Sequence, residues 1–171
     1  ARNAIVTREA VAAEAVRGGF TLVYPVLKGL EDTGRVRRGY FVAGLGATQF
    51  ALPGALDLLR SLRDAPEEAE VVTLAAADPA NPYGATLPWP AGGRGPTRSV
   101  GATVILVDGA LAAYLARGDR QLLTFLPDGD PGRSRTSRGV ARALADRARG
   151  GMLIEEIDGA PAGPHALAPF L

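Results

Sequence analysis

The sequence predicts an α+β protein in two parts, helix-rich before residue 66 and strand-rich after it. In the first part, an apolar helical segment is followed over residues 34–53 by a basic strand, a Gly-x-Gly turn and a return strand. This order is typical of a winged helix whose wing is the turn. In the second part, short β-like runs separated by Asp-Gly and Gly-Asp turns precede one helical segment. They predict a small antiparallel β-barrel-like domain with one packing helix.

Composition excludes several classes of protein. The 171 residues suffice for one domain or two small ones, and 47% of them are hydrophobic, enough to form a core. There is no cysteine, so disulfides, thiolate metal sites and thiol nucleophiles are excluded. No apolar run approaches the ~20 residues that span a bilayer, and the N-terminus lacks a signal-peptide pattern. We therefore expect a cytoplasmic protein without a membrane partner.

Charge is unevenly divided between the two parts. Residues 1–66 contain nine Lys or Arg and six Asp or Glu, whereas residues 67–171 contain ten and twelve. The basic part is the one with the wing-like stretch, and a local basic patch is what phosphate binding requires. Lys28 is the only lysine among 19 cations. Arginine suits phosphates and base edges, but the codon bias of a GC-rich genome would produce the same excess.

Two helices are expected first. Thr7–Val16 has Thr7 as N-cap and a Gly-Gly stop after it. Leu22–Asp32 would follow, with Pro25 tolerated in the first turn. Its apolar face would contain Leu22, Val23, Val26, Leu27 and Leu30, and its other face Thr21, Tyr24, Lys28 and Glu31.

The predicted wing comprises a strand over Val36–Ala43, a reversal at Gly44–Gly46 and a return strand over Thr48–Leu52. Alternation places Arg37 and Arg38 on opposite faces. Pro53 and Gly54 should break the strand, before a helix at Ala55–Arg63 with an inner stripe of Leu56, Leu59 and Leu62. The stretch 65–68 is the predicted boundary between domains 1–66 and 67–171.

The second domain should begin with a strand at Val71–Ala77 and a Pro- and Gly-rich loop containing Tyr83 and Trp89. Strands are predicted at Gly101–Val107, Leu111–Ala116, Gln121–Leu126 and Met152–Ile157, with a helix at Ser137–Arg149. The tail from Ala160 carries three prolines and should be poorly ordered. We expect the aromatic loop to act as a packing plug, with an interface anchor as the alternative.

No active site is visible in the sequence. The single histidine, His165, lies in the predicted tail without a partner that would make it a zinc ligand or catalytic base. Five aspartates precede Gly or Pro, as turn residues do: Asp78, Asp108, Asp128, Asp130 and Asp158. Gly44–Gly46 is not a dinucleotide fingerprint because no helix follows it, and no phosphate-binding GxxxxGK[ST] loop is present.

A DNA-binding surface is the site that the sequence favours. Arg35, Arg37 and Arg38 open the wing, with Tyr40 and Phe41 just after them. Arginines neutralise phosphates, and an exposed aromatic can stack on an unpaired base. The alternative is a solvated strand face. Because the strand alternates, both aromatics cannot share a face, and Phe41 is assigned to the core.

A second arginine cluster lies in the last helix and the turn before it: Arg133, Arg135, Arg138 and Arg142. Arg138 and Arg142 are four residues apart and share a helix face. With Asp130 and Asp146 nearby, a salt-bridged surface is the main interpretation and nucleic-acid binding the alternative.

Three stretches resemble one known family: GRVRRGYFVAGLGATQFALPGALDLLR, LAAADPANPYGATLPWP and VGATVILVDGALAAYLARGDRQLLTF. Their order and spacing resemble the C-terminal region of bacterial large helicase-related (Lhr) proteins over residues 5–158. The resemblance implies a series of winged helices and a β-barrel-like module, downstream of ATPase motor domains. The C-terminal region of that family is similar in architecture to winged-helix DNA glycosylases.

This resemblance implies a non-motor C-terminal module of an ATP-dependent DNA-repair helicase, with ATP and Mg expected in the parent's motor domains and no cofactor here. Motif positions carried over are Arg35, Arg37, Arg38 and Tyr40 on the wing and Gln49 on its return strand; Lys28 and Tyr24 would flank the same surface. Expected partners are single-stranded or forked DNA and the parent's upstream winged-helix and motor domains.

Two alternatives stay open at this point. One is an oligomerisation or interaction module that uses the barrel or the Tyr83–Trp89 loop, which would make a homo-oligomer. The other is a DNA glycosylase that flips out uracil or an alkylated base and attacks with carboxylate-activated water. Asp158 and the other turn aspartates are the weak candidates for that carboxylate, so whether this part of the chain is an enzyme stays undecided.

Overall fold

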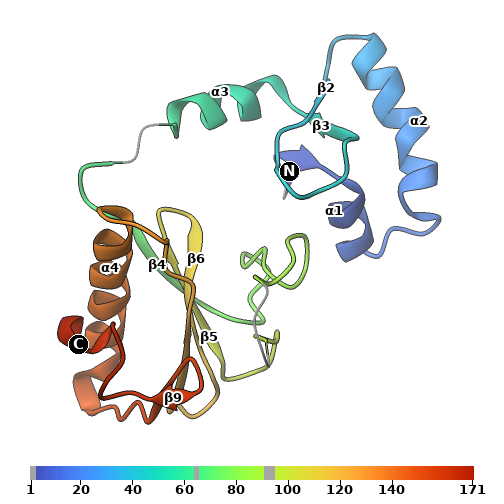
Figure 1. Cartoon of the computed structure of the whole chain (residues 1–171). Coiled ribbons are helices and arrows are strands. Elements are labelled where there is room, and N and C mark those ends of the chain that lie inside the picture. The colour runs from blue at the N-terminus through green and yellow to red at the C-terminus, as the bar shows by residue number, and fades with distance from the viewer. Residues whose placement is uncertain (1–2, 64–65, 91–94) are drawn as a thin grey trace. The chain divides into compact units, whose positions relative to one another are not determined.

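The structure is a computed structural model that describes residues 3–63, 66–90 and 95–171. It divides into two compact units (Figure 1). Unit 1 comprises residues 1–64 with 85–87, and unit 2 comprises residues 65–84 with 88–171. Each unit has its own sheet and its own core, and each is described by itself.

Unit 1 contains a short three-stranded antiparallel sheet of order β1-β3-β2. Its elements in chain order are β1 (Ile5–Val6), α1 (Arg8–Ala13), α2 (Gly19–Asp32), β2 (Arg37–Gly39), β3 (Gln49–Ala51) and α3 (Pro53–Ser61). The return strand is confirmed as the partner of the basic strand, but it is central, because β1 pairs with its other edge. Thr7 is confirmed as the N-cap of α1, its Oγ1 accepting the N–H of Ala10 at 3.1 Å.

The second helix differs from its prediction in where it starts and which face it buries. It begins at Gly19, so Pro25 lies inside the helix and not in its first turn. The inward stripe is the buried Leu27 with the partly buried Phe20, Val23, Tyr24 and Leu30, and it packs with Phe50 and Val36. Leu22 and Val26, predicted to face inward, are 65% and 63% exposed. The apolar face of the helix includes Phe20 and Tyr24. The prediction used only the aliphatic residues, and their spacing indicated a different face.

The wing strand is shorter than expected, and the following helix starts earlier. β2 has three residues, and a nine-residue loop, 40–48, connects it to β3. Pro53 does not break the strand into a turn; it is the first residue of α3, where its missing N–H costs nothing. Leu58 and Leu59 of α3 are 56% and 41% exposed, and Leu62, its C-cap, is 67% exposed, so Leu59 and Leu62 do not form the predicted inner stripe.

Unit 2 contains an open, mixed six-stranded sheet of order β4-β5-β6-β7-β8-β9. The strands are β4 (Val71–Ala75), β5 (Thr103–Val107), β6 (Ala110–Leu115), β7 (Gln121–Thr124), β8 (Glu156–Ile157) and β9 (Ala160–Pro161). The antiparallel meander of three strands is confirmed as β5, β6 and β7; β4 pairs antiparallel with β5, but β7 and β8 are parallel. No pairing among the described residues joins β4 to β9, so the predicted barrel is wrong. The strands at one end of the sheet, β8 and β9, have two residues each and are too short to close a barrel.

The two faces of this sheet are covered differently. On one face lies α4 (Gly132–Arg147), whose Val140, Ala143 and Leu144 pack on Ile105 and neighbouring strand residues (Figure 1). Gly139 allows the close approach: a Cβ there would lie 2.9 Å from Cγ2 of Val107.

Tyr83 and Trp89, both in unit 2, pack on the other face of the sheet. Tyr83 stacks on Trp89 with ring centroids 6.2 Å apart, and Trp89 meets Tyr114 edge-on at 6.0 Å. Arg98 fixes the loop by donating to four carbonyl oxygens, those of Ala77, Asp78, Asn81 and Tyr83. The expected packing role of the aromatics is confirmed within unit 2.

The C-terminal tail is not the poorly ordered segment that its prolines predicted. It forms β9 and a short 3-10 helix, η2 (Ala168–Phe170). Leu167 is completely buried in the core under α4. Burial of the Leu167 side chain stabilises the folded tail by more than its prolines disfavour it.

Candidate nucleic-acid interface

The wing loop is held in shape by one buried side chain. Gln49 is fully buried on the central strand. Its Oε1 accepts the backbone N–H groups of Phe41 and Val42, each at 2.8 Å, and its Nε2 donates to the carbonyls of Val42 and Gly46 at 2.9 and 3.0 Å. All four hydrogen-bonding positions of the amide are used. Gln49, expected on the DNA surface, therefore lies beneath it and shapes the wing.

The two aromatics of the wing have separate places. Tyr40 is 61% exposed, and its hydroxyl accepts the N–H of Gly44 at 3.0 Å, which braces the loop from outside. Phe41 is only half-buried and lies over Gly39, where a Cβ would be 2.7 Å from its Cζ. The fully buried aromatic of unit 1 is Phe50, so the assignment of Phe41 to the core was wrong.

Arg37 and Arg38 point to opposite faces of the sheet, as alternation predicted. Arg38 is opposite Phe50 in the register and Arg37 is opposite Ala51. Arg38 forms an ion pair with Glu31 of α2, with 3.2 Å between Nε and Oε1. Its charge is therefore partly neutralised.

The remaining cations of this group are uncommitted. Arg35, Arg37 and Lys28 are exposed, and none has an ion pair or a side-chain hydrogen bond with any residue that the structure describes. Uncommitted guanidinium groups can each take a phosphate without breaking an existing contact. Arg35 and Arg37 are thus the strongest members of the predicted site.

Tyr24 does not belong to the exposed surface on which it was expected. It packs against the core cluster of unit 1, edge-on to Phe50 with centroids 6.0 Å apart. The expected set thus separates into exposed residues (Arg35, Arg37, Arg38, Tyr40, Lys28) and supporting residues (Tyr24, Gln49).

One neighbour of the wing was missed in the sequence. Arg37 lines a hollow of about 240 Å³ together with Pro53, Leu56, Asp57 and Arg60 of α3. Arg60 lies in the helix predicted at Ala55–Arg63, but it was not predicted to belong to the site. The signal that could have found it is the spacing 53, 56, 57, 60, which is one face of a helix directly after the return strand.

The second arginine cluster is not one uniform surface. Arg135 forms an ion pair with Asp108, with 2.8 Å between Nε and Oδ2, and also donates to the carbonyls of Pro66 and Glu67. The hydrogen bond from Arg135 lowers the pKa of Asp108 and raises the pKa of Arg135 itself. The salt-bridge interpretation therefore holds for Arg135.

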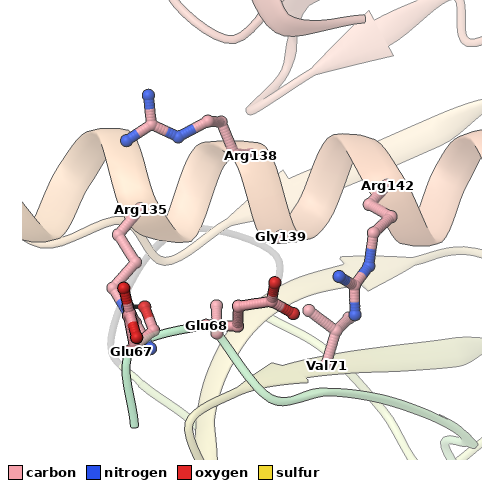
Figure 2. Close-up of a pocket in the computed structure, with 8 residues that line it drawn as sticks. Glu67, Glu68, Val71, Arg135, Arg138, Gly139 and Arg142 are labelled. Carbon is pink, nitrogen blue, oxygen red and sulfur yellow. Dashed lines mark hydrogen bonds between the residues drawn. The ribbon is translucent and has the colours of Figure 1, made fainter. Parts of the chain in front are cut away.

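Arg138 and Arg142 have no ion pair with the described residues and line a hollow of about 300 Å³ with Glu67 and Glu68. In Figure 2, Glu68 and Arg142 extend into the hollow from opposite sides, while Arg138 extends away from Glu68. Carboxylates in the same hollow repel phosphates, so this cluster is less suited to a nucleic acid than the wing.

The carboxylate and histidine considered for catalysis brace a turn. Asp158 accepts from the backbone N–H and the hydroxyl of Thr124, each at 2.6 Å, and its Oδ2 lies 3.2 Å from Nε2 of His165. The Nδ1 of His165 accepts the N–H of Leu167. These bonds occupy both oxygens of Asp158 and tie its turn to Thr124 of β7 and to His165, whereas the sequence predicted a side chain that caps its own turn backbone.

Two features are absent from the residues that the structure describes. No cluster of three His, Cys, Asp or Glu side chains that could hold a metal ion occurs there. None of the helices in the described ranges combines the length and apolar character needed to cross a membrane.

Comparison with known proteins gives a consistent result. The family described as "Large helicase-related protein, winged-helix domain" matches residues 1–71. The "Lhr helicase/ probable uracil glycosylase" of Mycolicibacterium smegmatis (strain ATCC 700084 / mc(2)155) is 47% identical over 168 residues, 92% of this chain and 11% of that protein. The "Lhr helicase/uracil glycosylase" of Escherichia coli (strain K12) is 42% identical over 129 residues, 72% of this chain and 8% of that protein.

The chain thus spans about a tenth of the length of the curated relatives that it matches. The matched family describes the winged-helix region, and that region corresponds to unit 1 with its sheet, wing and helices. The chain belongs to the Lhr helicase family, of which it represents one segment with a winged-helix domain at its N-terminal side.

Proposed function

We propose that this chain is a non-motor, DNA-contacting module of an Lhr-type DNA-repair helicase, acting in the cytoplasm on single-stranded or forked DNA. ATP and magnesium would be bound in motor domains elsewhere in the parent, beside which this module positions DNA. The observation that carries the proposal is a braced wing with two exposed, uncommitted arginines, Arg35 and Arg37.

The wing is suited to this role because it is preorganised. Gln49 and Tyr40 fix the loop from inside and outside, so binding DNA need not order it first. Arg35, Arg37 and Lys28 supply positive charge without breaking internal ion pairs. Exposed Tyr40 offers a ring for stacking on an unpaired base, an interaction of ~1–3 kcal/mol.

The test is salt-dependent binding of the chain to labelled single-stranded, forked and duplex DNA, followed by fluorescence anisotropy. Each phosphate contact contributes a slope of about −0.7 to −0.9 to the plot of log affinity against log salt. The double variant Arg35→Gln, Arg37→Gln should therefore make the slope shallower by about 1.4 to 1.8. Arg38→Gln should have a smaller effect, because Glu31 already holds Arg38.

A matched control is available in unit 2. Arg117 and Arg120 are exposed arginines outside the wing, and Arg120, unlike Arg35 and Arg37, is paired with Glu155. Their double Gln variant removes the same number of positive charges and should leave the slope near that of the unmodified chain. Equal effects of the two double variants would reject a wing-specific site. No salt-dependent binding by the unmodified chain would reject the proposal altogether.

A base-excising activity is the second candidate, and the names of both relatives favour it, since each includes uracil glycosylase. The candidate carboxylate Asp158 has both oxygens engaged, which argues against it as the group that activates water. Release of uracil or an alkylated base from labelled DNA, read as alkali-labile abasic sites, decides the question. If the Asp158→Asn variant still released the base, Asp158 would not be the catalytic carboxylate.

An interaction module is the third candidate, and exposed leucines at the end of α3 favour it: Leu58 and Leu59 in the helix and Leu62 at its C-cap. Exposed apolar side chains on one helix are typical of association surfaces. Light scattering at rising concentration tests self-association. A monomer at every concentration would reject self-association through these leucines.

A further inference from the structure

The hollow beside the wing has its own chemistry. It measures about 240 Å³ and is lined by Arg37 of β2 and by Pro53, Leu56, Asp57 and Arg60 of α3. All five residues belong to unit 1. The four residues of α3 follow the spacing i, i+3, i+4, i+7, so a single helix face is turned toward the wing strand.

The direction of Arg37 follows from the register. Arg37 is opposite Ala51, and Phe50, the next residue of β3, points to the core on the other side of the sheet. Because neighbouring strand residues alternate, Arg37 leaves the sheet on the side where α3 begins, right after β3. The chain thus brings two arginines, one from a strand and one from a helix, to the same hollow.

Charge in the hollow is unbalanced. Arg37 has no ion pair with the described residues, and Arg60 donates from Nη1 to Oδ1 of Asp57 at 3.1 Å. Both members of that pair are well exposed, by 68% and 73%. Exposed pairs of this kind contribute little and exchange readily. The hollow therefore holds two guanidinium groups and one carboxylate, and the carboxylate, paired with Arg60, competes with any anion for that arginine.

We propose that this hollow binds a phosphate of a nucleic-acid backbone, held jointly by Arg37 and Arg60. Binding transfers Arg60 from Asp57 to the phosphate, and Asp57 acts as a built-in competitor that limits affinity. Guanidinium groups suit phosphate because their planar forks can donate two hydrogen bonds to its oxygens. The inference rests on the proposed DNA contact and extends it from the wing onto the first two turns of α3.

Because Asp57 competes with the phosphate for Arg60, substitutions at positions 57 and 60 should change the affinity for DNA in opposite directions. Arg60→Gln should weaken binding to forked DNA and make the salt slope shallower by about 0.7 to 0.9, one phosphate contact. Asp57→Asn should strengthen binding by about 1.5- to 5-fold, the range that corresponds to loss of an exposed ion pair. Asp57→Asn combined with Arg60→Gln should show no such gain from the Asn, because the freed arginine is absent.

Arg63→Gln is the matched control, since Arg63 is an exposed arginine just past the end of α3 and does not line the hollow. Far-UV circular dichroism checks that every variant is folded. Replacing chloride by inorganic phosphate at equal ionic strength distinguishes a general phosphate site, which would be blocked, from one that needs the DNA backbone. Competition by millimolar inorganic phosphate would overturn the backbone assignment.

The outcomes separate this inference from the proposed function. If the unmodified chain binds DNA and Arg35→Gln with Arg37→Gln weakens it, but Arg60→Gln behaves like Arg63→Gln, the hollow is rejected and the wing stands. An unchanged affinity for Asp57→Asn would likewise overturn the competitor. If the unmodified chain does not bind DNA, both proposals fall together.

Discussion

Replacing Gln49 is the perturbation whose effect follows most directly from the structure. Its amide accepts two backbone N–H groups and donates to two carbonyls of the wing loop, and the side chain is fully buried. Met is close in size and shape but cannot make these bonds. Gln49→Met therefore leaves four backbone groups of Phe41, Val42 and Gly46 without their partner.

The size of the effect can be bounded. A hydrogen bond contributes about 0.5–1.5 kcal/mol net, so four of them give roughly 2–6 kcal/mol. Part of this is recovered, because loop residues next to the exposed Tyr40 can turn toward water. We expect Gln49→Met to lower the free energy of unfolding of unit 1 by about 2–4 kcal/mol.

Two measurements check this expectation. Urea unfolding followed by circular dichroism gives the loss of stability, and amide hydrogen exchange shows whether the N–H groups of Phe41 and Val42 lose protection. Gln121→Met is the matched control, because Gln121 is exposed and makes one side-chain bond, to Glu156. If Gln49→Met matched this control within about 0.5 kcal/mol and exchange at Phe41 stayed slow, the role given to Gln49 would be refuted.

Three further perturbations test unit 2. Gly139→Ala would place a Cβ 2.9 Å from Cγ2 of Val107, and the overpacking should cost about 1–3 kcal/mol in urea unfolding followed by the single tryptophan. Arg98→Met removes the donor to four carbonyls and should cost about 2–4 kcal/mol and shift the tryptophan emission, because the aromatic loop loosens. Asp108→Asn should flatten the acid limb of stability against pH. The pKa of Asp108 is lowered in the folded state by the hydrogen bond from Arg135, so its contribution is present above the unfolded pKa and disappears as pH falls through the lowered one.

Each of these has a control or a contradicting result. Gly150→Ala adds a Cβ where nothing lies within 4 Å and should be nearly neutral. An unshifted tryptophan emission in the Arg98 variant would show that the four carbonyls do not need the guanidinium. An acid limb equally steep with Asn at position 108 would show that other carboxyls govern acid unfolding.

Local patterns predicted much of the fold because they depend on neighbouring residues. The N-cap at Thr7, the pairing of β2 with β3 and the meander of unit 2 all follow from capping, alternation and turn chemistry. What failed depends on distant contacts. The parallel pairing of Leu122 with Ile157 and the burial of Leu167 link segments that no periodicity connects.

The candidate site was predictable in type but not in detail. The arginines were visible as a run, and their alternation separated Arg37 from Arg38. The sequence could not show that Glu31 would neutralise Arg38, or that Gln49 would turn inward to the wing loop, because both depend on how the loop returns. Arg60 was missed because it comes near Arg37 only in the folded protein, where α3 starts beside the sheet.

The salt dependence of DNA binding tests the central claim most directly. For the unmodified chain on forked DNA, log affinity plotted against log salt should fall with a slope of about −2 or steeper, from Arg35, Arg37 and Lys28 together. With Gln at positions 35 and 37, the slope should become shallower by about 1.4 to 1.8, while the control pair at 117 and 120 leaves it unchanged. A slope that is the same in all three proteins would contradict a DNA-binding wing.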